Sequence, residues 1–171
     1  MGIIGNNNVE ATAWGCPNNA LAIKKAALVY TAVAGDVADS VNIYCDSWAV
    51  ANYYIGIYTV TAGLPDVLVG GEHTVPVPNT GPPKIWRSTA INVPLTAGVG
   101  YMIAVRGVGG ARGMMDVTEL STGSYDGSSP LPAVWTHASS ERGTFSLYAN
   151  VKNVAPPVIN IYYPCCAQLI T

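Results

Sequence analysis

The chain has 171 residues, of which 50% are hydrophobic but only 11% are charged, whereas about 25% of the residues of an average soluble domain are charged. The net charge is −2, and the eight lysines and arginines are scattered along the chain, which argues against a surface that neutralises nucleic-acid phosphates. No apolar run approaches the roughly 20 residues that a membrane-spanning helix needs. We expect one principal domain. The shortage of charged residues indicates that partner molecules cover much of the protein surface.

The N-terminal residues contain neither a basic segment nor an apolar segment, so the sequence predicts no secretory signal. We expect residues 1–25 to form an N-terminal arm and residues 26–151 to form the main domain. Residues 152–171 are expected to be a C-terminal arm or a closing strand. Residues 18–27 are the one helix candidate, and they are short for a helix.

Alternation of apolar and polar residues dominates the rest of the chain and predicts strands. Two short edge segments, residues 67–69 and 74–77, are expected in addition, because Pro76 and Pro78 cannot serve a central strand. The longer strands are expected at residues 26–34, 40–47, 52–61, 84–93, 101–108, 114–120 and 144–151. The side chains predicted to share inward faces are Val41, Ile43, Cys45, Tyr53, Ile55, Ile57, Thr59, Tyr101, Ile103, Val105, Phe145, Leu147, Ala149 and Val151.

About eight strands at regular spacing predict an all-β antiparallel sandwich, of jelly-roll topology, with extended terminal arms. After residue 151 a Pro156-Pro157 break precedes an apolar tail. This tail either closes the sheet as a last strand or docks on a neighbouring subunit. The residues expected to make that assembly contact are Val158, Ile159, Ile161, Tyr162, Tyr163, Leu169 and Ile170.

Residues 26–151 resemble β-sandwich modules of the choice-of-anchor type, which occur in bacterial surface proteins and phage virion proteins. The resemblance rests on YIGIYTV at residues 54–60, on LTAG at residues 95–98 followed by a strand that begins with Tyr101, and on Trp135 before a final β segment. It implies a jelly-roll-like sandwich used for display, adhesion or sugar contact. It brings no catalytic residues with it.

The sequence offers little for catalysis. Its two histidines, His73 and His137, lie near Glu72 and Glu141, and we expect all four in solvated loops. No G-x-S-x-G motif occurs, and most carboxylates lie at turns. We therefore predict that the protein is not an enzyme and needs no cofactor.

Asp36 and Asp39 form the best candidate pair for a loop-bound calcium ion, since calcium prefers carboxylate and carbonyl oxygens. The alternative is a plain turn whose charges are solvated. The four cysteines, Cys16, Cys45, Cys165 and Cys166, do not have zinc-ligand spacing. They are expected to be thiols in a reducing compartment, with a disulfide between the tail and Cys16 or Cys45 as the alternative.

Aromatic side chains exposed on a rigid sheet bind sugars when polar groups lie nearby. The alternative is that these rings fill the core and the subunit contacts, where both residue types are enriched. The candidate ligand-contact residues are Tyr44, Trp48, Tyr54, Tyr125 and Trp135.

The leading hypothesis is a virion structural protein, such as a capsid decoration, head-fibre or tail-associated subunit. Its partners would be copies of itself and other virion proteins, and it would assemble in the host cytoplasm. The alternative hypothesis is a carbohydrate-binding or adhesion module at an extracellular or cell-surface location, with glycans as partners.

Overall fold

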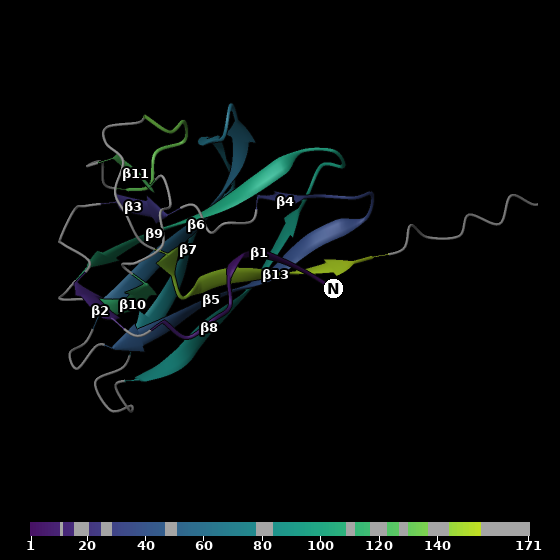
Figure 1. The fold of residues 1–171 in the computed structure, drawn as a ribbon. Coiled ribbons are helices and arrows are strands. Elements are labelled where there is room, and N and C mark those ends of the chain that lie inside the picture. The colour runs from purple at the N-terminus through teal and green to yellow at the C-terminus, as the bar shows by residue number, and fades with distance from the viewer. Residues whose placement is uncertain are drawn as a thin grey trace, which may run out of the picture.

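Two antiparallel β-sheets pack face to face in the computed structural model (Figure 1). The structure describes residues 1–10, 12–15, 21–24, 29–46, 51–77, 84–108, 112–116, 123–126, 130–136 and 144–154. None of these residues belongs to a helix long and apolar enough to cross a membrane. The strands are β1 (Gly2–Asn6), β2 (Thr12–Gly15), β3 (Leu21–Lys24), β4 (Tyr30–Thr31), β5 (Asp36–Asp46), β6 (Ala51–Thr61), β7 (Leu64–Val77), β8 (Lys84–Pro94), β9 (Gly100–Val108), β10 (Arg112–Asp116), β11 (Gly123–Asp126), β12 (Thr144–Phe145) and β13 (Leu147–Asn153).

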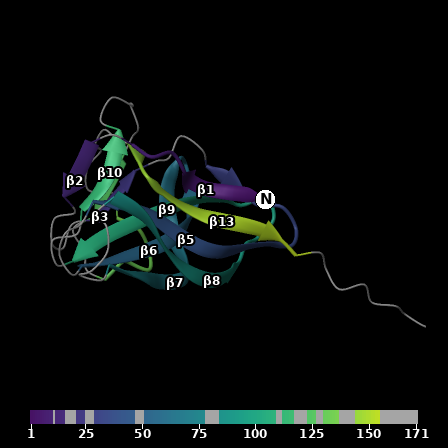
Figure 2. The same cartoon turned by 90° about the horizontal axis from the view of Figure 1, so that it is seen from below.

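The eight principal strands form four nested antiparallel pairs. β1 pairs with β13, β4 with β9, β5 with β8, and β6 with β7. Two further pairings, β13 with β5 and β9 with β6, join these pairs into a first sheet of order β1-β13-β5-β8 and a second of order β4-β9-β6-β7. Figure 2 shows β1, β13 and β5 side by side in the first sheet. This rolled-up hairpin is the jelly-roll arrangement that the strand spacing predicts.

Shorter strands extend both sheets at one end. β10 continues the first sheet beside β5 and carries β2 and β12, while β3 continues the second sheet beside β9 and carries β11. The helix expectation for residues 18–27 is therefore wrong for residues 21–24, the part that the structure describes. Because Leu21 and Ala22 pair with β9, sheet hydrogen bonds prevail over a weak local helix preference.

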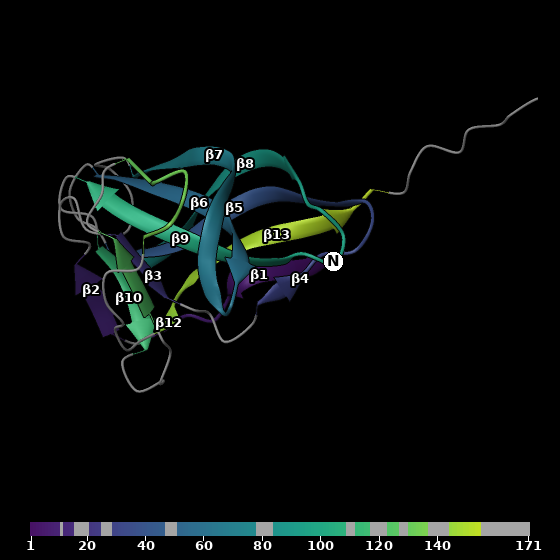
Figure 3. The same cartoon turned by 90° about the horizontal axis from the view of Figure 1, so that it is seen from above.

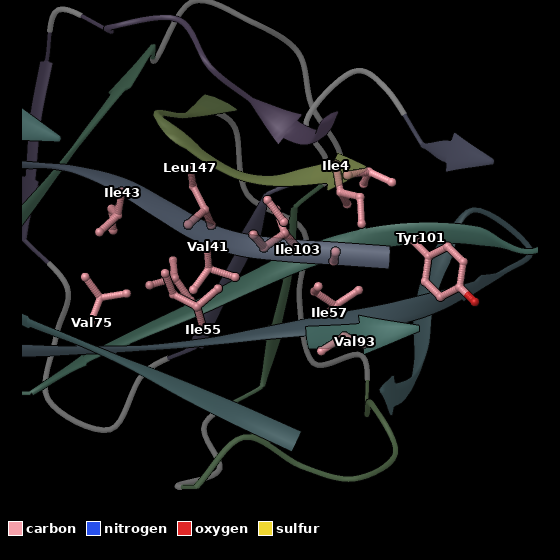
Figure 4. Close-up of a cluster of buried hydrophobic side chains, with 14 of the residues drawn as sticks. Ile4, Val41, Ile43, Ile55, Ile57, Val75, Val93, Tyr101, Ile103 and Leu147 are labelled. Atoms are coloured by element: carbon pink, nitrogen blue, oxygen red, sulfur yellow. The ribbon is translucent and has the colours of Figure 1, made fainter. Parts of the chain in front are cut away.

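The core lies between the sheets and is formed by the inward faces of β5, β6, β9 and β13 (Figure 4). Alternation in the sequence identifies these faces because successive side chains of a strand point to opposite sides of the sheet. The predicted inward side chains that are at most 4% exposed are Val41, Ile43, Cys45, Tyr53, Ile55, Ile57, Tyr101, Ile103, Val105, Leu147, Ala149 and Val151.

The segment expected to be an N-terminal arm contributes strands to both sheets. In β1, Ile4 is fully buried in the core, and every residue from Gly2 to Asn6 has a partner in β13. At the other end, Lys152 and Asn153 complete β13. The tail residues named above for assembly, 158–170, lie outside the described residues.

β7 is one long strand and not the two short segments that the prolines suggest. It does lie at the edge of the second sheet, as predicted, and pairs only with β6 among the described strands. Two register shifts interrupt that pairing, and Gly70 and Gly71 adopt positive φ angles of 72° and 80°. An edge strand can contain Pro65 and Pro76, because the N–H group that a proline lacks is not needed on the side without a partner strand.

A second apolar cluster covers the outer side of the second sheet. Residues 130–136 cross β6 and β7 there, and Leu131 and Trp135 pack on Tyr58 of β6 and Ala104 of β9. Backbone hydrogen bonds hold this segment: Leu68 N–H donates to the Ala133 carbonyl, and Trp135 N–H donates to the Asp66 carbonyl. The outer face of the second sheet is therefore partly covered by the chain itself.

Candidate functional site

Three aromatic rings meet on the outer face of the first sheet. Trp86 lies between Tyr44 and Tyr148, with ring centroids 5.4 Å and 5.0 Å apart and interplanar angles of 67° and 74°. Both contacts have the edge-to-face geometry that aromatic quadrupoles favour. All three side chains are only partly buried. We call Tyr44, Trp86 and Tyr148 the aromatic cluster.

Strand register explains how these residues meet. Tyr44 of β5 is directly opposite Trp86 of β8, whereas Tyr148 of β13 is opposite Asn42 of β5. β8 and β13 flank β5, so they lie about 10 Å apart at the usual strand spacing. The indole therefore extends across β5 to reach Tyr148. Asn42, beneath this crossing, is only 5% exposed.

A row of amide and hydroxyl groups continues from the aromatic cluster along the same face. Ser88 Oγ donates to Asn42 Oδ1, and Asn42 Nδ2 donates to Ser40 Oγ over 3.4 Å. Asn150 Nδ2 also donates to Ser40 Oγ, over 2.9 Å. These bonds fix the polar side chains, and fixed hydroxyl and amide groups can recognise a ligand with little loss of side-chain entropy.

Tyr44 is the one predicted ligand-contact residue that belongs to this cluster. Sequence reasoning missed Trp86 and Tyr148. Both occupy outward positions in alternating strands, which was the signal that could have identified them. Their proximity depends on the register of β5 with β8 and β13, which no local pattern reveals.

Tyr54 lies on the other sheet and has a different partner. The Arg106 guanidinium carbon is 3.7 Å from the centroid of the Tyr54 ring, which is a cation–π contact. Arg106 also donates from Nε and Nη2 to the two carboxylate oxygens of Glu72, at 2.9 Å each. Leu131 N–H donates to the same carboxylate over 2.9 Å. Tyr54 is thus part of the ionic contact that holds residues 130–136 to the sheet.

Trp135 is buried, with 7% of its surface exposed, and its ring contacts Tyr58 edge-to-face at 5.3 Å. It therefore does not offer an exposed ring to a ligand, and the expectation of ligand contact is corrected for this residue. Tyr58 Oη donates to the Pro132 carbonyl over 2.7 Å, which holds the covering segment in place. Trp48 and the side chain of Tyr125 lie outside the described parts of the structure.

Asp36 and Asp39 do not form a shared calcium site. Asp36 is 3% exposed, and its carboxylate accepts hydrogen bonds from Tyr30 Oη, Val33 N–H and Asn153 Nδ2. Asp39 instead lies 4.0 Å from Lys152 Nζ. The described residues contain no group of three or more potential metal ligands. The calcium hypothesis is therefore corrected: donor groups already occupy the Asp36 oxygens.

Hydrogen bonding also favours the ionised form of the Asp36 carboxylate. The bond from Tyr30 lowers the pKa of Asp36, burial acts in the opposite direction, and the bonds from Asn153 and Val33 lower it further. Burial, followed by the bond to Asp36 and its negative charge, raises the pKa of Tyr30 to about 12. The two groups therefore form a neutral-phenol, ionised-carboxylate pair that ties β4 to β5 and β13.

Glu72 and His73 lie in strand β7, so the expectation that they occupy a solvated loop is wrong. Glu72 is held by Arg106, and His73 is opposite the fully buried Ile55. Burial lowers the pKa of His73, whose Nε2 atom is buried without a hydrogen-bond partner. His137 and Glu141 lie outside the described residues.

No protein-family model, no curated protein and no solved structure matches this chain. The fold class is therefore assigned from the strand order. The strand order defines the class of protein as an all-β two-sheet sandwich.

Proposed function

We propose that the protein is a non-enzymatic virion structural protein that acts through subunit assembly, as a capsid decoration, head-fibre or tail-associated subunit does. Its partners would be copies of itself and other virion proteins. Support comes from the low content of charged residues and from the resemblance of residues 26–151 to choice-of-anchor-type modules of virion proteins. Jelly rolls are common in capsid proteins, but they also occur in lectins.

The open edge of β8 is the observation that carries this proposal. Among the described strands, β8 pairs only with β5, so one row of its backbone N–H and C=O groups faces away from the sheet. A long strand with a free edge can pair with another chain unless charges, prolines or bulges block it. The charged residues of β8, Lys84 and Arg87, lie in its first part, whereas the exposed residues of its second part, Ser88, Ala90 and Asn92, carry no charge.

The neighbouring edge strand is protected in a way that β8 is not. Figure 3 shows β7 and β8 near one another at one side of the sandwich. β7 contains Pro65 and Pro76 and two register shifts, whereas β8 has a single register shift, between Ala90 and Val93, and its only proline is its last residue, Pro94. We therefore place the proposed contact between subunits at β8, with a second copy of the chain as the partner.

Support for a non-enzymatic role comes from how the candidate acid and base groups are used. Glu72 is held in an ion pair with Arg106, and Asp36 accepts three hydrogen bonds. Neither carboxylate is free to activate water. The proposal accordingly assigns the protein a binding role, in the virion and in the host cytoplasm where virions assemble.

Size-exclusion chromatography with light scattering tests the assembly proposal. The native chain should have a mass above 17.8 kDa that rises with concentration. Ala90→Lys should reduce that mass to the monomer, because a lysine in the middle of the edge disfavours strand pairing. The matched control, Val33→Lys, changes a 57% exposed residue in a turn and should leave assembly unchanged. A native chain that is monomeric up to its solubility limit would contradict the proposal.

A further inference from the structure

The two groups of aromatic rings that contain a tryptophan, among the described residues, have different surroundings. In the Tyr58–Trp135 pair the side chains are 0% and 7% exposed, because residues 130–136 cover them. The aromatic cluster of Tyr44, Trp86 and Tyr148 is instead partly open to solvent. Packing within the chain explains the burial of Tyr58 and Trp135. Part of the aromatic cluster has no covering group among the described residues.

We propose that the aromatic cluster binds a glycan by stacking against the apolar face of a pyranose ring. The indole of Trp86 spans β5, and the planes of its two tyrosine neighbours are inclined to it by 67° and 74°. Because Trp86 is only partly buried, part of this flat ring is accessible to a sugar that lies between two steeply inclined rings. Aromatic side chains bury large contact areas at low entropic cost because they have only two rotatable bonds.

The polar groups next to the cluster fit sugar hydroxyl groups. Ser88 is exposed and directly follows Trp86 on the same face of β8. Ser40 and Asn150 come next, about 7 Å further along the strands, since successive residues on one face are two residues apart. All three side chains are neutral and can both donate and accept hydrogen bonds, as hydroxyl groups require.

The arrangement fits an oligosaccharide better than a charged ligand. At one end Lys84, two residues before Trp86 on the same face of β8, is a single exposed cation. Beyond the polar row at the other end, Asp39 and Lys152 pair with each other at 4.0 Å. No cluster of positive charge lies beside the rings to attract phosphate groups, among the residues that the structure describes. A chain of several sugar units could stack on the cluster and extend over Ser40 and Asn150. Binding to such an open surface should be weak, in the millimolar to micromolar range of dissociation constants.

This inference is independent of the proposed assembly, although both involve β8. Assembly would use the backbone edge of the strand, whereas the glycan would contact side chains on its outer face. Self-association and glycan binding can therefore be present or absent independently. A variant that loses only one of these two properties distinguishes the two roles.

Affinity electrophoresis tests the glycan site directly. The full chain would be run through native gels that contain xyloglucan, hydroxyethylcellulose or galactomannan, and it would also be applied to a printed array of oligosaccharides. At least one polysaccharide should retard the native protein. Trp86→Ala should weaken the binding at least tenfold, which corresponds to about 1.4 kcal/mol. Trp86→Phe should keep part of the affinity because it keeps a ring.

The matched control is Ile85→Ala. Ile85 precedes Trp86, is 37% exposed and points to the other side of β8, so its loss should leave glycan binding unchanged. Near-ultraviolet circular dichroism of each variant would establish that it is folded. Absence of binding to every gel and every array position would overturn the inference, and so would equal binding by Trp86→Ala. Loss of self-association in Trp86→Ala without any glycan binding would show that the cluster is a protein contact.

Discussion

The phenol of Tyr30 donates a hydrogen bond of 2.6 Å to the carboxylate of Asp36, which lies six positions along the chain in the first residue of β5. The same carboxylate accepts a bond from Asn153 at the end of β13. One buried charge therefore joins a strand of the second sheet to two strands of the first. It closes one end of the sandwich.

Loss of this bond should destabilise the protein in a pH-dependent way. Tyr30→Phe should lower the free energy of unfolding at pH 7 by about 1.5–3 kcal/mol, the usual contribution of a hydrogen bond to a charged group. Folding raises the pKa of Tyr30 from 10.0 to about 12. Its contribution is thus complete below pH 10 and is lost as the pH rises from 10 towards 12.

Urea unfolding of the native and Tyr30→Phe proteins at a series of pH values checks this prediction. The difference between their free energies of unfolding should be constant from pH 7 to pH 9 and should then narrow. Tyr44→Phe is a suitable control, because the Tyr44 hydroxyl makes only an exposed 3.3 Å bond to the Lys84 carbonyl. A constant difference up to pH 12 would show that Tyr30 does not couple to Asp36.

The ion pair of Arg106 and Glu72 should contribute more than the other described pair. The two side chains are 9% and 20% exposed, so removing one leaves a poorly solvated charge. We expect Glu72→Gln to cost about 2–4 kcal/mol, near the low end for buried pairs because Glu72 keeps some solvent contact. Lys152→Ala, which removes an exposed partner of Asp39, should cost less than about 1 kcal/mol.

A double-mutant cycle separates the pair from its surroundings. Arg106→Met combined with Glu72→Gln should be less destabilising than the sum of the two single changes, because no unpaired charge remains. Denaturant unfolding of the four proteins gives the coupling energy. Strictly additive effects would contradict the assignment of a coupled pair.

Cys45 should be unreactive in the folded protein. Burial raises the pKa of its thiol to about 12, although a hydrogen bond with Tyr53 and the charge of Arg87 act in the opposite direction. Thiol reagents attack the thiolate, which is therefore scarce at pH 8. Titration with a chromogenic disulfide should give the native chain and Cys45→Ala the same number of fast-reacting thiols. They should differ by one thiol only after unfolding in guanidinium chloride.

Gly70 and Gly71 provide a matched test of how closely β7 packs against β8. Both have positive φ angles, so alanine at either position should cost about 1–2 kcal/mol. A Cβ at Gly70 would also lie 2.6 Å from Val93 Cγ2, whereas a Cβ at Gly71 would meet no atom within 4 Å. Gly70→Ala should therefore be the more destabilising by a further 1–3 kcal/mol or so. Equal thermal unfolding midpoints for the two variants would contradict the predicted clash with β8.

The sequence predicts the core of this fold well because apolar residues alternate along the strands that form it. Alternation identified Val41, Ile43 and Ile55 as inward residues, and each is at most 1% exposed. Tyr58 is not among the residues that alternation assigns to that core. Alternation could not predict that Tyr58 is fully buried by Leu131 and Trp135, because this contact joins segments more than 70 residues apart.

The candidate site was less predictable for the same reason. Tyr44 was identified from its place on the outer face of a strand, but its partner Trp86 comes from a strand some 40 positions later. Glu72 and His73 were misplaced because a Gly-Gly pair usually marks a turn, whereas here it forms a bulge within β7. Bulges and long-range register are set by tertiary packing, which the local pattern does not contain.

The nesting of the strand pairs also constrains how the chain reaches its native state. β1 leaves the ribosome before the other described strands, yet its partner β13 is formed by residues 147–153. Ile4 therefore lacks its partner strand until β13 has been made, and among the described strands only the innermost hairpin, β6 with β7, joins neighbours in the sequence. Folding should be slow, as it is for proteins whose contacts join distant residues. We expect a nascent chain stalled before β13 to expose its apolar N-terminal strand to chaperones.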